Sequence, residues 1–165
     1  MSNRPARKHR YVLAAFAVAL ALGVGATPGT AGAAGLITIS KQPLSDTNRD
    51  CNGAPISSPT RDLGSALMIQ TPRFLAPTGY LITLVFVHDA TPKATYNIRI
   101  IQEGPAGLVG SCYVVVGKVT TDATGNGWMI AATAVLVGAT TWFVDLNNQQ
   151  NFADFLDTNL ATIAT

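Results

Sequence analysis

The sequence predicts an all-β fold, a two-sheet β-sandwich of seven or eight short strands behind an N-terminal signal peptide. Three observations carry this prediction. Short apolar or alternating runs recur after residue 35, and turns rich in Gly, Pro, Asn and Asp separate them. Two cysteines lie far apart in the same region. A closed barrel is the alternative architecture.

The N-terminal segment has the order of a secretory leader. The first ten residues contain four basic side chains and no acidic one, and residues 11–24 are uncharged and mostly apolar. Small residues then offer cleavage after Ala26 or Ala33, and we expect Ala33. Because the apolar run is shorter than the roughly 20 residues that span a bilayer, we expect a signal peptide at 1–33. A single β-sandwich domain at 34–165 then follows, secreted and without a membrane span.

Charge gives no sign of an anionic partner. Four of the eleven basic residues belong to the leader, so the mature chain has seven Lys and Arg against nine Asp and Glu. The basic balance of the whole chain is therefore a property of the leader, and we predict no nucleic-acid partner.

Cys51 and Cys112 both lie in the exported part. An even count in an oxidising compartment predicts one intrachain disulfide, with two free thiols as the alternative. The bridge would close a long loop and stabilise the fold by about 4 kcal/mol at most. Neither cysteine has the spacing or the neighbouring histidine of a redox, metal or nucleophilic site, so both are expected to be structural.

The strand pattern is clearest in the middle of the chain. Residues 80–88 are apolar on both faces, as in a central strand. Residues 95–103 alternate, with Tyr96, Ile98 and Ile100 on the side expected to be buried. Further strands are expected at 36–40, 63–70, 112–121, 128–137 and 140–147, with a long surface loop at 41–62 and a helical turn at 152–156 before an edge strand.

The strand at 140–147 has two distinct faces. Trp142, Val144 and Leu146 share one face, which we expect in the core, and Thr141, Asp145 and Asn147 lie mainly on the other, polar side.

Few residues have the chemistry of an active site. His88 is the one histidine outside the leader and precedes Asp89, but neighbours on a strand point to opposite faces. Glu103, the single glutamate, has no evident carboxylate partner at the separation that glycoside hydrolysis needs. We therefore expect no enzyme and no catalytic residue, and a small hydrolase that uses His88 or Glu103 is an alternative.

Metal and cofactor sites are not predicted either. Asp122 and Asn126 flank Gly125 and offer oxygen ligands, as calcium loops do, but the longer ladder of acidic residues is missing. The residue types of a β-turn explain this segment.

The most plausible binding surface combines aromatic and amide side chains. Tyr80, Tyr96 and Trp142 are in phase with aliphatic residues and are expected to be packed. Aromatic and amide groups elsewhere are suited to sugars or peptides. This candidate surface consists of Tyr113, Trp128, Asn148, Gln149 and Gln150.

Parts of residues 79–150 resemble small secreted proteins of actinobacteria. The similarity rests on the turns and strands at 90–98, 120–127 and 139–146 and on Cys112. It implies an immunoglobulin-like β-sandwich and transfers no functional residue. The expected function is thus a non-catalytic extracellular or envelope-associated module for binding or structure, with a cell-envelope component or a glycan as partner. A carbohydrate-binding domain is the second alternative.

Overall fold

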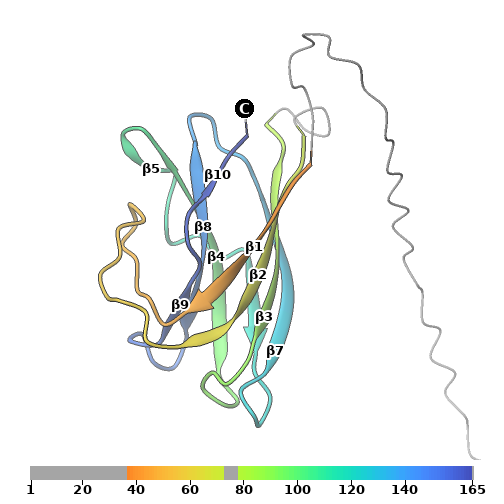
Figure 1. Ribbon diagram of the computed structural model, residues 1–165, viewed down its shortest axis with the longest axis vertical. Coiled ribbons are helices and arrows are strands. Elements are labelled where there is room, and N and C mark those ends of the chain that lie inside the picture. Colours follow the sequence, from red (N-terminus) through yellow and green to blue (C-terminus); the bar gives the residue numbers. More distant parts are fainter. Residues whose placement is uncertain (1–36, 73–77, 165) are drawn as a thin grey trace, which may run out of the picture. The chain divides into compact units, whose positions relative to one another are not determined.

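The computed structural model describes residues 37–72 and 78–164, which form strands and contain no helix (Figure 1). All strand pairs are antiparallel. The predicted all-β class is confirmed. The ten strands are β1 (Thr38–Ser45), β2 (Asp62–Gln70), β3 (Tyr80–Val87), β4 (Thr95–Gly104), β5 (Gly107–Val109), β6 (Gly117–Thr120), β7 (Gly127–Ala134), β8 (Thr141–Asn148), β9 (Phe155–Asp157) and β10 (Ala161–Thr162).

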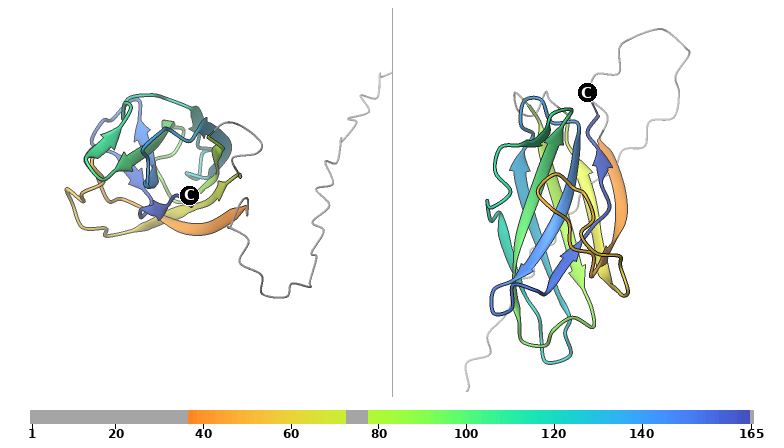
Figure 2. Two further views of the ribbon diagram at one scale, coloured as in Figure 1. Left: turned by 90° about the horizontal axis from the view of Figure 1, so that it is seen from above. Right: turned by 90° about the vertical axis from the view of Figure 1, so that its left-hand side faces the viewer.

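The strands form one curled sheet in the order β5-β4-β8-β9-β1-β2-β3-β7, with β6 paired to β4 and β10 paired to β8. The curl brings β6 close to β7, since a Cβ atom on Gly117 would lie 3.2 Å from that of Ala131. Seen from above, the strands surround a common interior as a half-barrel (Figure 2).

Alternating side chains from all parts of the sheet fill this interior. Tyr96 and Ile98 of β4 and Trp142, Val144 and Leu146 of β8 are almost completely buried there, as their spacing predicts. The register of these two strands therefore agrees with the sequence pattern.

The first strand is longer than predicted. β1 continues to Ser45 because it pairs with β2 along its whole length and places Leu44 in the core. Pro43 lies within it, at a strand that has a second partner only at Ser45, and prolines are tolerated at such edges. The predicted loop at 41–62 is thus shortened to 46–61.

Two other segments also differ from prediction. The strand expected at 112–121 is reduced to β6, and the residues before it are drawn to Cys51 by the disulfide at Cys112. The helical turn expected at 152–156 is wrong, since Phe155–Asp157 is β9. Pairing of fully buried Leu156 with Leu146 keeps this segment extended.

We predict that Val144→Asp lowers the free energy of unfolding by several kcal/mol, because it places a carboxylate in the apolar interior. Thr141→Asp, three residues away on the half-exposed outer face, should cost less, about 1–2 kcal/mol, from the lost hydrogen bond to Glu103 and from repulsion by that residue. Urea unfolding of both variants measures the difference. Equal losses would contradict the register of β8.

Candidate functional site

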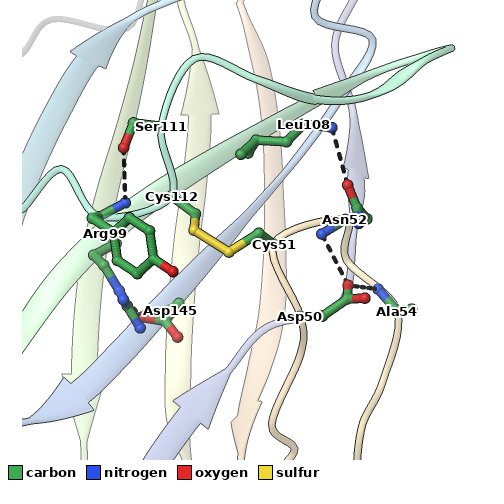
Figure 3. The surroundings of a disulfide bond; sticks show 10 residues. Asp50, Cys51, Asn52, Ala54, Arg99, Leu108, Ser111, Cys112 and Asp145 are labelled. Atoms are coloured by element: carbon green, nitrogen blue, oxygen red, sulfur yellow. Dashed lines mark hydrogen bonds and ion pairs between the residues drawn. A yellow bond between two sulfur atoms is a disulfide. The ribbon is translucent and has the colours of Figure 1, made fainter.

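The outer face of β4 and β8 is covered by two loops. Ile101 and Phe143 are cross-strand partners on this face, and Leu108 and both cysteines pack on them. The predicted Cys51–Cys112 disulfide is confirmed and joins the loop 46–61 to the segment 110–116 above this small second core (Figure 3). The sheet is therefore buried on both sides in this half of the domain.

A row of charged residues crosses three strands beneath the same cover. Arg99, Asp145 and Asp157 are successive cross-strand partners on β4, β8 and β9. Nε of Arg99 lies 2.5 Å from Oδ2 of Asp145, and the exposed fractions of Asp145 and Asp157 are 2% and 1%. Asp145 and Asn147, on the polar side of the strand, are both buried, and Asp145 lies between Arg99 of β4 and Asp157 of β9.

Arg49 fastens that loop to β9. Its backbone N–H donates to Oδ2 of Asp157 at 2.7 Å. Its guanidinium group donates to the carbonyl oxygens of Thr158 at 2.9 Å and Gly53 at 2.7 Å. Asp157 therefore serves as an acceptor that holds the cover in place.

Burial changes the protonation of the two aspartates. It raises the pKa of Asp145 and of Asp157, and the nearby charge of Asp145 raises the pKa of Asp157 further, to about 9. Arg99 favours the charged form of Asp145, so we place the shared proton on Asp157. The pair resembles an acid–base dyad in its chemistry, but its enclosure leaves no room for a substrate.

Glu103 is also under the cover. Burial raises the pKa of its carboxyl group, and the charge of Asp50 adds to the effect. Its Oε1 atom has no hydrogen-bond partner among the described residues. Gly53, at φ +71°, lies so close that a Cβ atom there would collide with this carboxylate.

His88 lies elsewhere, at the end of β3. Its Nδ1 is 3.2 Å from Oδ2 of Asp89, and both side chains are exposed. The expectation that they point apart is wrong, because Asp89 has left the strand and has a φ of 52°. His88 and Ser65 line one shallow groove, which Glu103 does not reach. No hydrogen bond joins the histidine to Ser65 in the described structure.

The predicted binding residues occupy different elements. Tyr113, in the segment after β5, and Trp128, on β7, have exposed fractions of 77% and 66%. Gln150 is exposed, whereas the amide of Gln149 donates to Oδ1 of Asn97 at 2.6 Å. No hydrogen bond in the described structure joins Tyr113 or Trp128 to the amide residues.

Asn148 does not belong to that surface. Its exposed fraction is 1%, its Nδ2 donates to Asp154 at 2.8 Å, and its Oδ1 accepts from the backbone of Gln150 at 2.9 Å. This residue shapes the turn after β8, which explains why an amide in an apparently solvated loop is buried.

One feature of the described surface was not predicted from the sequence. The outer sides of β1, β2, β3 and β7 carry aliphatic and aromatic residues in register across four strands. The apolar character of 80–88 on both sides was a signal, but it was interpreted as burial. We call this surface the apolar face; it consists of Ile39, Leu67, Ile69, Tyr80, Ile82, Leu84, Phe86, Trp128 and Ile130.

The turn at Asp122 is explained by its own hydrogen bonds, since Oδ1 accepts from the backbone of Thr124 at 2.8 Å and of Asn126 at 3.0 Å. Residues 37–72 and 78–164 contain no group of three or more side chains suited to a metal ion. Nor does this part of the chain include a helix long and apolar enough to cross a membrane.

No protein-family model matches the chain, and neither does a curated protein or a solved structure. Its function therefore has to be argued from the surfaces described above.

We predict that Asp157→Asn raises the free energy of unfolding at pH 8 by on the order of 2 kcal/mol or more. The folded pKa of Asp157, about 9, is above the ordinary value of 3.8, so the stability from its proton is complete in acid and is lost as the pH rises toward 9. The amide can donate to Asp145, accept from Arg49 and needs no proton. In urea titrations between pH 4 and pH 9, the free energy of unfolding of the wild type should fall steeply as the pH rises. That of the variant should fall less.

Asp122→Asn is the matched control. Hydrogen bonds from Asn126 and Thr124 lower the pKa of exposed Asp122, so its contribution is present at neutral pH and is lost in acid. This variant should keep the alkaline slope of the wild type. If the free energy of unfolding depended on pH equally in the wild type and in Asp157→Asn, the shared proton would be contradicted.

Proposed function

We propose that the mature domain is a non-catalytic module outside the cell, free or associated with the envelope, that acts through its surface in binding or structure. One observation carries this proposal. The apolar face is open to solvent, while the carboxyl groups with raised pKa values, those of Glu103, Asp145 and Asp157, are enclosed beneath a disulfide-tied cover. Exposed apolar patches of this extent mark interaction sites.

The surroundings of the titratable groups support a non-catalytic role. Strongly perturbed pKa values commonly indicate active sites, but structural networks perturb them as well. Here the hydrogen bonds of Asp157 and Asp145 go to Arg49, to Arg99 and to each other. They hold the protein together, and the one histidine outside the leader lies apart from them.

The leader and the disulfide support export. The basic and apolar segments precede the described domain, and the Cys51–Cys112 bridge suits an oxidising compartment. The proposed relationship to immunoglobulin-like secreted proteins of actinobacteria is supported by the antiparallel strands within 79–150. A solved structure of such a protein with another strand order would refute it.

A carbohydrate-binding domain is the second candidate, and one observation favours it. Phe86 and Trp128 are cross-strand partners on the apolar face, with exposed fractions of 45% and 66%. Adjacent exposed rings can stack on sugars. Hydrogen-bonding groups gather at one end of the face, where Ser65 pairs with Phe86 and shares a groove with Lys41, Asp62 and His88. Most of the face is aliphatic or aromatic, which favours an apolar partner over a glycan.

The export part of the proposal predicts that protein recovered from the medium starts near Ala34 or Thr27 and contains no free thiol. Intact mass spectrometry after alkylation without reduction tests both points. A mass that still includes Met1 to Val24 would contradict cleavage. Alkylation at Cys51 or Cys112 would contradict the disulfide.

The non-catalytic part predicts no turnover of ester, peptide or glycoside substrates by the wild type, and no change in any binding on His88→Ala. Loss of a general base would lower a rate by about 10²–10⁴-fold. Ser65→Ala is the companion variant, because Ser65 lines the same groove. A turnover that both substitutions abolish in a folded protein would establish the hydrolase alternative.

A further inference from the structure

The outer surface is covered in one half of the sheet and exposed in the other. On β4 and β8 the outer residues Ile101 and Phe143 are covered by Leu108 and by the two cysteines, whose disulfide Figure 3 shows. On β1, β2, β3 and β7 the outer residues are equally apolar, and no described segment lies over them. A sheet with an apolar face normally packs against another layer. Within residues 37–72 and 78–164, the apolar face therefore has no covering layer of the kind that the other half has.

The extent of this face is that of an interface. At about 200 Å² for a fully exposed side chain of this size, its five most exposed members leave on the order of 500 Å² in solvent. The half-buried members, such as Leu67 and Leu84, add to that area. This sum approaches the roughly 800 Å² that each partner buries in a stable complex.

The composition of the face favours one kind of partner. Lys41 on β1 is the charged residue in register with the face, and Asp62 and His88 lie with it in the groove at one end, so the charges stay at the margin. Faces so poor in charge are typical of homodimers, whose interfaces resemble a core cut in two. The slightly acidic mature chain has no basic rim to attract an anionic membrane.

We propose that a second copy of this chain covers the apolar face, so that two domains pack sheet on sheet. Each copy supplies the layer that the other lacks, with side chains interdigitating as in a β-sandwich core. Lys41 can extend its ammonium group to solvent at the margin of such a contact. The dimer rests on the proposed function in that both use this face, but the domain can be a non-catalytic module without it.

Sedimentation velocity of the purified protein, obtained by expression of the full chain, tests the proposal from 1 to 100 µM. We expect a dimer, and Ile130→Glu should weaken it at least tenfold. Ile39→Glu, on the opposite edge of the face, should do the same. Val137→Glu is the matched control, because Val137 is 86% exposed but lies outside the face, and it should leave the dimer unchanged.

Trp128 provides a second readout, since its emission should shift to the red on dilution while Trp142 stays buried. A wild type that is monomeric at 100 µM overturns the proposal, as does a dimer that both face variants leave intact. A monomer that binds phosphatidylcholine vesicles, or cellulose or chitin in a manner lost in Trp128→Ala, assigns the face to lipid or glycan instead. None of these outcomes tests whether the protein is an enzyme, because the substrate screen decides that question separately.

Discussion

The disulfide between Cys51 and Cys112 is the constraint on which the outer layer of this domain depends. The two cysteines are 61 residues apart in the sequence, and their bond joins two loops. These loops cover the face of β4 and β8 that points away from the main core. With those loops in place, β8 is buried on both sides and can carry Phe143 outward as well as Trp142 inward. Arg49 attaches the same cover at a second point, so the loop 46–61 behaves as part of the sheet.

Burial of the charged row beneath this cover is tolerated because each ion has a partner. Arg99 compensates Asp145, and the carbonyl groups around Arg49 accept its donors. Among the described residues no cation forms an ion pair with Asp157, and retention of a proton is the less costly state for it. The perturbed pKa values thus arise because these carboxyl groups are buried where the cover is attached. A catalytic dyad would also need access for a substrate, which the enclosure of this pair does not allow.

Sequence reasoning succeeded where a pattern records a single face. Alternation placed Tyr96 and Ile98, or Trp142 and Val144, on the inner side, because neighbouring strands enforce the same period of two. It could not show what covers the polar side of a strand: Asp145 is buried beside Asp157, which Arg49 binds from 108 residues earlier in the chain. Asn148 was mistaken for a surface amide for a similar reason, since its partner Asp154 follows an intervening turn. The apolar face was not predicted because an apolar sequence pattern does not distinguish a buried strand surface from an exposed one.

The position of β7 bears on how further assembly can occur. Its eight residues include neither a charge nor a proline, and in the sheet it pairs with β3 alone. Such an edge would ordinarily invite strand addition. The curl of the sheet brings β6 against it, however, so the edge is partly shielded while the adjoining apolar face is not. Edge pairing can propagate from chain to chain, whereas a face packed on its own copy is satisfied by one partner. This geometry therefore favours a closed pair over an open polymer.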